Sequence, residues 1–500
     1  MTVLCMRCTR DTKILRPQRC VALDGKPCSA CTEDVELEKA IKELENQIEN
    51  MHTKRRALRT IMNENHDQLI ANFPPEISSQ IFIHYAPPVG VSDKNDRDSP
   101  LYLGAVCQKW RQVAWRTPHL WTSLFVRFKP HSSQLLAELL ERSATLPLTI
   151  VLSPDSEQII DDKIYLEAIN ILNMHSSRWH ILHNTLPACY LHRLCGSLEG
   201  NPPLRQLVLR PLMESAHHRN ACNGATFGMK FKPSPTHFTL AKYRLANIDI
   251  IWSRIASAKL EHIGIDECFE FMRRTPLLET LILLRVAPSS GAFPIPTTRI
   301  VLPHLESFEM RNMTDGMVAK ILDSMCAPSL KHWNHQISID RSSVSHMVSF
   351  IDQSSFSLKT FKMGDIHSPV HRVLYHLSSL EHLELQLWLN TLFSTNQLIN
   401  WLCGSDESSP FLPHLQTLEF NPQITFPWPG ESLWRIFSSN RRSLTVKINQ
   451  RFKAEIPNEA AEELLKLVDE GFDLRVIRDG KVDVLEECRE KRHLSQSTRQ

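Results

Sequence analysis

Apolar residues recur at characteristic spacings along this chain, and each change of spacing marks a boundary between segments. Between Val35 and Asn65 the apolar residues alternate at intervals of four and three, with Glu and Lys dense between them. These positions are Leu37, Ile41, Leu44, Ile48, Met51, Leu58 and Met62, and Arg55 alone interrupts the series. Such a seam, about four heptads long, is typical of a coiled coil or a helical hairpin arm. We predict one long helix over 34–66 that self-associates or packs, in preference to a solvated helix folded back on the next domain.

Two short amphipathic helices are predicted between Phe73 and Leu124. Pro74 and Pro75 can occupy the first helical turn, where a missing N–H costs nothing. The apolar residues that follow at helical spacing are Ile77, Ile81, Phe82 and Tyr85. After a polar insert, the second helix carries Leu103, Val106, Cys107, Trp110, Val113 and Ala114, and Pro118 forbids its continuation. Leu120, Trp121 and Leu124 add so much apolar bulk to a unit of about fifty residues that the surplus indicates a partner.

A third spacing, L-x-x-L-x-L with one aromatic or Met substitution, recurs through 201–450. Units begin at Leu204, Leu260, Leu278, Leu305, Leu330, Leu358, Leu380 and Leu415. Segments between them, such as DECFEFMRRTP and DGMVAKILDSMCAP, have helical period and close on a proline. This resembles leucine-rich repeats, whose units stack into a solenoid because each has too little apolar surface to stand alone. The alternative is an unrelated α/β domain with Leu-rich strands.

The repeat pattern also predicts which strand positions face the core. Alternate strand residues point to opposite faces, so Leu281, Leu383 and Leu418 are expected to point inward. The more exposed positions, available to a target, are Glu279, Thr280, Glu381, His382, Gln416 and Thr417.

Weaker patterns flank the repeats. In 128–200, LLAELLERS and IYLEAINIL are helical by period and LPLTIVL is strand-like, which indicates an α/β connector. The polar, His-rich stretch from Pro211 to Thr236 is predicted to be a long loop. After Lys447, EAAEELLKLVDEG predicts a helix ending at Gly471, and FDLRVIRDGKVDVL predicts a hairpin. We expect this C-terminal helix and hairpin to cover the exposed apolar end of the solenoid.

Composition narrows the function classes. The 57 basic and 55 acidic side chains nearly cancel, which argues against a general nucleic-acid surface or an acidic-lipid binder. Most of the 13 Cys are scattered singly, as in reduced proteins. The N-terminus lacks the apolar core of a signal peptide, and no later run approaches a membrane span. We expect a soluble protein of the cytoplasm or nucleus.

Two Cys pairs stand near the N-terminus, Cys5 with Cys8 and Cys28 with Cys31. Their separation lies within the range of four-thiolate zinc sites, so zinc at these four residues is one hypothesis. The other is a reduced, flexible tail. We favour the tail because neither pair is followed by the usual Gly; no other cofactor is expected.

The motifs between Phe73 and Trp121 resemble an F-box, of the fungal, basidiomycete-like type in which a proline-flanked insert separates two helices. The order is Phe-Pro-Pro-Glu-Ile, Ile-Phe, Val-Cys-x-x-Trp and Leu-Trp, with Phe73 where the family usually has Leu. In that family the module docks onto the adaptor subunit of an SCF-type cullin–RING ubiquitin ligase, and the rest of the chain recruits a protein substrate. The resemblance implies an adaptor-binding site of Phe73, Pro74, Pro75, Glu76, Ile77, Ile81, Phe82, Leu103, Val106, Cys107, Trp110, Leu120 and Trp121.

Catalytic sequence motifs are missing. The chain has no phosphate-binding G-x-x-x-x-G-K-[ST], no dinucleotide glycine pattern, no H-E-x-x-H and no G-x-S-x-G. Histidines of the repeat region are expected to face solvent: His262, His304, His332, His382 and His414. Cys107 is expected to be a small core residue, since its neighbours supply no activating base. These features favour a non-enzymatic protein.

The sequence therefore supports two hypotheses of function. The leading one is a substrate-recognition adaptor of the ubiquitin ligase, with the repeats binding a target protein. The alternative is a non-degradative scaffold that self-associates through the N-terminal coiled coil. The expected fold class is multidomain α and α/β. Its parts are a Cys-containing flexible segment (1–33), a coiled-coil helix (34–66), a small all-α F-box (67–127), a connector (128–200), an irregular leucine-rich-repeat-like α/β solenoid (201–450), and a cap with a charged tail (451–500).

Overall fold

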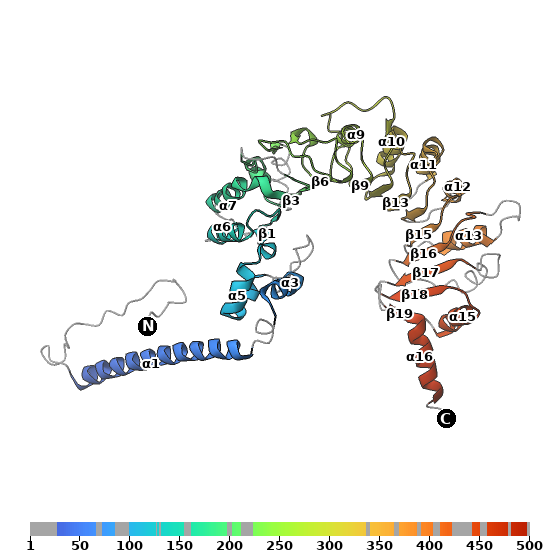
Figure 1. Cartoon of the computed structure of the whole chain (residues 1–500). Helices are drawn as coiled ribbons and strands as arrows, with labels where there is room; N and C mark the ends of the chain where they lie inside the picture. The colour runs from blue at the N-terminus through green and yellow to red at the C-terminus, as the bar shows by residue number, and fades with distance from the viewer. Residues whose placement is uncertain are drawn as a thin grey trace. The chain divides into compact units, whose positions relative to one another are not determined.

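A computed structural model of the chain describes residues 28–66, 73–85, 100–126, 128–129, 132–154, 162–197, 203–211, 224–336, 341–364, 370–387, 392–403, 411–422, 443–450, 458–478 and 482–497. These residues form a mixed α/β structure with a long N-terminal helix and a large, mostly parallel sheet (Figure 1), which confirms the fold class at that level. The chain divides into two compact units. The helical unit comprises Met1–Pro87 and Asn95–Leu120, and the sheet unit comprises Pro88–Lys94 and Trp121–Gln500.

The described residues of the helical unit form four α-helices. They are α1 (Ser29–His66), α3 (Pro75–Tyr85), α4 (Pro100–Val106) and α5 (Gln108–Trp115). The long helix predicted over 34–66 is confirmed and begins a few residues earlier. In α3 the prolines act as expected, because the N–H groups of Ile77 and Ser78 both donate to the Pro74 carbonyl at 3.1 Å and close the first turn.

The prediction of one continuous helix from Leu103 to Ala114 is wrong. The chain breaks at Cys107, whose backbone is extended (φ −154°, ψ 174°). The Cys107 sulfur accepts a hydrogen bond from the Trp110 N–H at 3.4 Å and so serves as the N-cap of α5. The Arg111 Nε donates to the Gly104 carbonyl at 2.8 Å, which gives a partner to a carbonyl at the end of α4. A sequence pattern at helical spacing cannot reveal such a break, because both halves keep the same apolar face.

Fifteen strands within the described residues form one sheet. They are β1 (Ser123–Val126), β2 (Leu148–Leu152), β3 (Trp179–Asn184), β4 (Gln206–Leu209), β6 (His237–Ala241), β8 (Ser257–Glu261), β9 (Thr280–Leu284), β11 (Ser307–Arg311), β13 (His332–Gln336), β14 (Thr360–Met363), β15 (His382–Leu387), β16 (Thr417–Pro422), β17 (Thr445–Gln450), β18 (Leu474–Arg478) and β19 (Val482–Asp483). They lie side by side in chain order. Every neighbouring pair is parallel except the terminal hairpin of β18 and β19.

The α-helices that connect many of the strands lie along one side of the sheet (Figure 1), whereas the described residues between β3 and β4, between β6 and β8 and between β9 and β11 include no α-helix. The α-helices are α6 (Ser132–Arg142), α7 (Asp162–Met174), α9 (Ile265–Arg274), α10 (Asp315–Ser324), α11 (Arg341–Ser354), α12 (Val370–Tyr375), α13 (Leu392–Cys403), α15 (Asn458–Asp469) and α16 (Val484–Ser497). Single 3-10 turns occur at η3 (Pro118–Trp121), η4 (Ser176–Arg178), η5 (Ala188–Arg193) and η6 (Leu245–Asn247). Two small parallel sheets pair β5 (Phe227–Gly228) with β7 (Ile248–Asp249), and β10 (Ile300–Val301) with β12 (Met325–Cys326).

The core lies between the sheet and these helices. Leu281, Leu383 and Leu418 were predicted to point inward, and all three are fully buried. Burial alternates along β9, as expected where only one face of a sheet is covered. In β15 and β16 the polar residues Glu384 and Asn421 are buried as well, and they are hydrogen-bonded to each other. Replacing one such Leu by Asp would place an unpaired charge in the core.

Three sequence predictions about the sheet need correction. The unit LEHIGI was placed five residues too late. Leu260 is the last apolar core position of β8, and the first core position of this unit is Ile255, just before the strand. The strands β1, β3, β6 and β17 were not predicted, and β1 lies inside the segment 67–127 that was expected to be all-α. The strand β17 extends the sheet beyond Lys447. The stretch 211–236 was predicted to be a loop; the described part of it contains β5, while 212–223 lie outside the described residues.

The predicted C-terminal elements are confirmed. The helix expected to end at Gly471 is α15, and Gly471 has a φ of +90°, a conformation that glycine adopts without steric cost. The predicted hairpin is formed by β18 and β19. Its proposed turn residues, Asp479 and Gly480, lie outside the described residues.

Candidate protein-interaction surfaces

The helical unit is organised around two aromatic rings. Phe82 from α3 is 1% exposed, and its ring centroid lies 4.8 Å from that of Trp110 on α5. The Thr117 hydroxyl donates to the Val113 carbonyl at 2.8 Å and lies 2.9 Å from the Ser79 hydroxyl, which ties the end of α5 to α3. Because the unit is small, these few contacts carry much of its stability.

The predicted adaptor-binding residues fall into two groups. The first group is wholly or partly buried and contributes to packing within the helical unit or at its end. Its buried members are Phe82, Leu103, Leu120 and Trp121, and its half-buried members are Ile81, Cys107 and Trp110. Leu120 ends the helical unit, and Trp121 is the first residue of this part of the sheet unit. Phe73, Pro74, Pro75, Glu76, Ile77 and Val106 are exposed. Only this second group can meet a partner without rearrangement.

Three further exposed apolar residues were missed from the sequence. Leu101, Tyr102 and Trp115 belong to α4 and α5, beside positions that were predicted. Together with Phe73, Ile77 and Val106 they make six large apolar side chains that are 42 to 52% exposed. Their helical spacing resembles that of buried positions, so the sequence offered no signal that separates them from the core.

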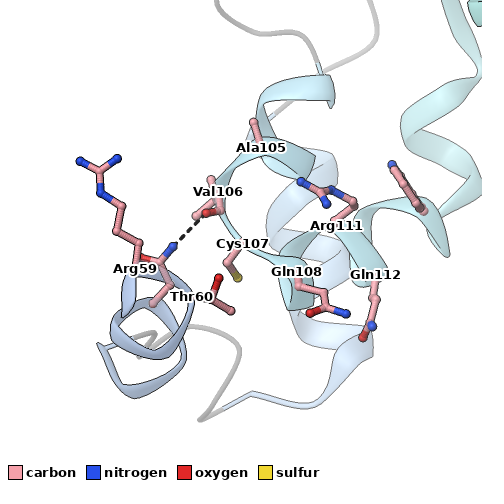
Figure 2. A pocket seen from close by; sticks show the side chains of 10 residues that line it. Arg59, Thr60, Ala105, Val106, Cys107, Gln108, Arg111 and Gln112 are labelled. Carbon is pink, nitrogen blue, oxygen red and sulfur yellow. Dashed lines mark hydrogen bonds between the residues drawn. The ribbon is translucent and has the colours of Figure 1, made fainter. Parts of the chain in front are cut away.

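Val106 and Trp115 line a surface pocket of about 490 Å³ between α1 and the α4–α5 pair. Figure 2 shows Arg59 and Thr60 of α1 on one side and Arg111 and Gln112 of α5 on the other. The Asn63 side-chain amide donates to the Val106 carbonyl at 3.2 Å and closes one edge. Apolar walls with charged and amide groups at the rim suit an inserted apolar side chain of a protein partner.

The sheet unit presents a polar face on the side opposite its core. The six residues predicted to be accessible are all half-buried or exposed, which confirms that prediction. Strand register aligns side chains of this face in rows across the strands. One row holds Thr360, His382, Thr417 and Thr445. A second row holds Lys362, Glu384, Glu419 and Lys447. Four of the five highlighted histidines are exposed, and His382 is half-buried.

Side chains from β15, β16 and β17 are hydrogen-bonded across this face. The Asn421 amide donates to Glu384 Oε1 at 2.6 Å, and the Asn449 amide donates to Glu419 Oε1 at 2.6 Å. Lys362 forms an ion pair with Glu384. These contacts order the face without a ligand.

His382, Glu384 and Glu419 are the group best placed to hold a cation, since their ligand atoms lie within 4.8 Å of one another. The His382 Nε2 is 3.7 Å from Glu419 Oε2. Burial lowers the pKa of His382, an effect that the two carboxylates oppose. Because Lys362 and two amides already pair with the carboxylates, the cluster is explained as an internal polar network.

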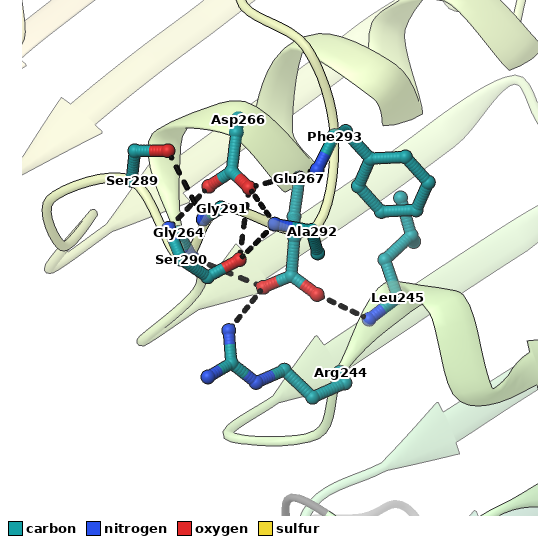
Figure 3. A network of polar contacts seen from close by, with 10 residues as sticks. All are labelled: Arg244, Leu245, Gly264, Asp266, Glu267, Ser289, Ser290, Gly291, Ala292 and Phe293. Carbon is teal, nitrogen blue, oxygen red and sulfur yellow. Dashed lines mark hydrogen bonds and ion pairs between the residues drawn. The ribbon is translucent and has the colours of Figure 1, made fainter.

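A second polar network surrounds the buried carboxylates of Asp266 and Glu267 at the start of α9 (Figure 3). Asp266 accepts from the N–H groups of Ser290, Ala292 and Phe293 at 2.7, 2.9 and 3.2 Å, and from the Ser290 hydroxyl at 2.8 Å. Burial alone would raise the pKa of Asp266, but these hydrogen bonds outweigh it and hold that pKa at about 2. The network fixes the loop after β9 against α9.

Glu267 completes this network. It accepts from the Leu245 N–H at 2.8 Å and lies 3.5 Å from Arg244. A Cβ on Gly264 would stand 2.7 Å from the Asp266 carboxylate, so close packing requires glycine there. Since these carboxylates accept from main-chain donors, the pair stabilises the fold and is a poor candidate for acid–base catalysis.

Two histidines of the sheet unit are buried and were not singled out from the sequence. Neither ring nitrogen of His183 or His335 has a hydrogen-bond partner in the described part of the chain. Burial lowers the pKa of both, and that of His335 to about 4. Both rings are therefore neutral at pH 7.

The proposed zinc ligands are only partly covered. Cys5 and Cys8 lie outside the described residues, whereas Cys28 is half-buried and Cys31, in the first turn of α1, is exposed. Zinc binding by the four thiols therefore stays a hypothesis, the less favoured of the two.

Comparison with known proteins identifies no family or relative for this chain. No family model matches the chain, and a search of curated proteins finds no match. Within the described residues, no helix has both the length and the apolar character needed to cross a membrane. Function must therefore be argued from the two surfaces themselves.

Proposed function

We propose that the chain is a non-catalytic substrate-recognition subunit of an SCF-type cullin–RING ubiquitin ligase. Its F-box-like helices bind the adaptor subunit, and its sheet unit binds the protein to be modified. Catalysis then belongs to other subunits, and this chain contributes proximity between target and ubiquitin donor. Such a subunit acts in the cytoplasm or nucleus.

The observation that carries the proposal is the exposed apolar surface of the helical unit. Seven large apolar side chains, the six named above and Tyr85, are each about half exposed along the segment from Phe73 to Trp115. Two of them, Val106 and Trp115, share the pocket of Figure 2. Exposed apolar side chains in this number on so small a unit support a protein-interaction site there. The buried contact of Phe82 with Trp110 gives that surface a defined scaffold.

We propose target binding for the sheet unit because one face of its sheet packs against the core while the other face is accessible to a target. We propose that its strand-helix units form an irregular leucine-rich-repeat-like solenoid, because each strand pairs with the next one along the chain. Its accessible face then carries rows of hydroxyl, imidazole and charged groups at fixed spacing. Such rows can recognise an extended protein segment through many polar contacts.

Recovery of the full-length protein from cell extract, followed by mass spectrometry, tests this proposal. We expect a cullin and its adaptor subunit in stoichiometric amounts. Ile77→Glu and Val106→Glu should each reduce their recovery about thirtyfold, the effect of losing a hot spot worth about 2 kcal/mol. Val301→Glu is the matched control, since Val301 is somewhat more exposed than Ile77 and Val106 but lies on β10 of the sheet unit.

Stability must be measured beside binding. The three Glu variants should unfold like the wild type, because the changed side chains are exposed. Phe82→Ala combined with Trp110→Ala should lose both binding and the fold of the helical unit, since truncating a buried aromatic costs roughly 3 to 5 kcal/mol. If the surface variants retain the adaptor, the assignment of this surface fails.

The alternative is a scaffold that self-associates and plays no part in degradation. The exposed apolar seam of α1 favours it, because the helical unit leaves that seam uncovered. The same mass spectrometry decides between the two: recovery of other partners without cullin or adaptor contradicts the ligase and supports the scaffold.

A further inference from the structure

The helix α1 carries an uncovered apolar seam along most of its length. It runs without interruption through 38 residues, from Ser29 to His66. The seven apolar seam residues are each 50 to 63% exposed: Leu37, Ile41, Leu44, Ile48, Met51, Leu58 and Met62. A stripe of this kind in water requires a partner with a matching stripe.

The spacing of the seam identifies the kind of partner. In heptad notation the a positions are Ile41, Ile48, Arg55 and Met62, and the d positions are Leu37, Leu44, Met51 and Leu58. Branched or long aliphatic residues at all but one of these positions are typical of a two-stranded coiled coil. The seam can therefore pack against another helix whose apolar residues have the same heptad spacing.

Charge is divided unevenly along the helix. Residues 33–49 contain seven acidic and two basic side chains, whereas residues 50–63 contain four basic and no acidic ones. Two copies laid antiparallel therefore place each acidic half against a basic half. We propose that α1 binds α1 of a second copy of this chain as an antiparallel coiled coil.

One register pairs every apolar seam residue except Leu44 with an apolar residue of the second copy. With the two-fold axis between Glu49 and Asn50, the layers are Leu37 with Met62, Ile41 with Leu58, Leu44 with Arg55, and Ile48 with Met51, each repeated by symmetry. The flanking e positions then bring Glu38 opposite Arg59, and Glu45 opposite His52. The one polar seam residue, Arg55, lies at the edge beside Glu45 of the second copy.

The parallel arrangement is disfavoured by the same residues. It places Arg55 against Arg55 in the centre of the seam. Its flanking g and e positions bring Glu33 against Glu38, and Lys54 against Arg59, so both pairs repel. A polar residue at a single a position fixes orientation in this way.

The interface has the size of a specific one. Fourteen apolar side chains, each about half exposed, offer on the order of 1,000 Å² of surface, the lower end for a specific interface. In this register residue 66 of one copy lies opposite residue 33 of the other. The two C-terminal ends of the helices are then about 50 Å apart, at 1.5 Å per residue. The dimer therefore presents two copies of everything that follows α1, one at each end.

This proposal uses only residues of α1 and stands or falls independently of the ligase. Sedimentation of the full-length protein at micromolar concentration should give the mass of a dimer. Leu44→Lys with Ile48→Lys should give a monomer whose helix content and thermal unfolding are otherwise unchanged, because both side chains are exposed. Asn46→Lys, on the opposite side of the helix, should remain dimeric.

Orientation is tested by charge reversal. Glu38→Arg places two Arg residues at each end of the antiparallel dimer and should weaken it about tenfold, and adding Arg59→Glu should restore it. In a parallel dimer Glu38→Arg faces Glu33 and strengthens association instead. A wild type that is monomeric, that is trimeric, or that holds a different protein in a stoichiometric complex contradicts the proposal, and strengthening by Glu38→Arg contradicts the orientation.

Discussion

Substituting Asp266 by Asn should destabilise the sheet unit in a pH-dependent way. The buried carboxylate accepts four hydrogen bonds between 2.7 and 3.2 Å from the loop after β9. Asn keeps the shape but loses the charge, and it turns an N–H₂ group toward donors. The affected contacts span 24 to 27 positions in sequence, so the loop loses its main attachment to α9.

The size of the effect follows from the pKa of Asp266. That pKa is 3.8 when unperturbed and about 2 in the folded chain. A difference of nearly 2 between the unfolded and folded pKa corresponds to roughly 2 to 3 kcal/mol, since one pKa unit is about 1.36 kcal/mol. Because the folded pKa is depressed, this stability is present in full above pH 3.8 and disappears as pH falls toward 2. We expect Asp266→Asn to cost about 2 to 3 kcal/mol at pH 7, and the difference from wild type to halve by about pH 3.

Amide hydrogen exchange at Ser290, Ala292 and Phe293, together with chemical denaturation at several pH values, measures this effect. Glu270→Gln on the same helix is the control, because Glu270 pairs with Arg274 near the surface and should contribute less than about 1 kcal/mol. Wild-type exchange protection in Asp266→Asn, or a stability difference that does not change with pH, would refute the reasoning.

Further predictions concern the core, the buried imidazole and the metal hypothesis. Leu383→Asp should unfold much of the sheet unit in thermal denaturation, whereas Glu381→Ala with His382→Ala should change its stability by less than about 1 kcal/mol. The wild type should lose about 3 kcal/mol of stability as pH falls from 6.5 toward 4, because the unfolded chain protonates His335 in this range and the folded chain does not. His335→Leu should lack this loss, and equal acid sensitivity of the two proteins would contradict the prediction. Metal analysis of the full-length protein purified without added zinc decides whether the N-terminal Cys pairs hold an ion, and a metal-free protein supports the flexible tail.

Periodicity alone predicted the elements whose apolar residues face a single partner surface. The helix α1, the helix α9 and the strands from β9 to β16 were found in this way, since burial on one face leaves an alternating or heptad pattern. The same pattern could not reveal the break at Cys107, because α4 and α5 keep a common face. It also misplaced β8, where Ala258 occupies a core position that a search for Leu overlooks.

The interaction surfaces were predicted less well than the fold. Leu101, Tyr102 and Trp115 look like core residues in the sequence, and only the structure shows that the helical unit is too small to cover them. The network around Asp266 depends on a loop more than twenty residues away, which no local pattern encodes. Conversely, the accessibility of His382 beside the buried Leu383 was predicted, because strand alternation determines which side chains leave the core.

Direct binding of the purified full-length chain to the purified adaptor subunit of a fungal cullin–RING ligase tests the central claim. We expect a one-to-one association per chain, weakened about thirtyfold by Val106→Glu and preserved in Val301→Glu, because only Val106 lies on the exposed surface of the helical unit. The monomeric Leu44→Lys, Ile48→Lys variant should bind equally well. If the folded wild-type chain does not bind the adaptor, the ligase assignment is contradicted. If Val106→Glu binds as tightly as the wild type, the assignment of the binding surface is contradicted.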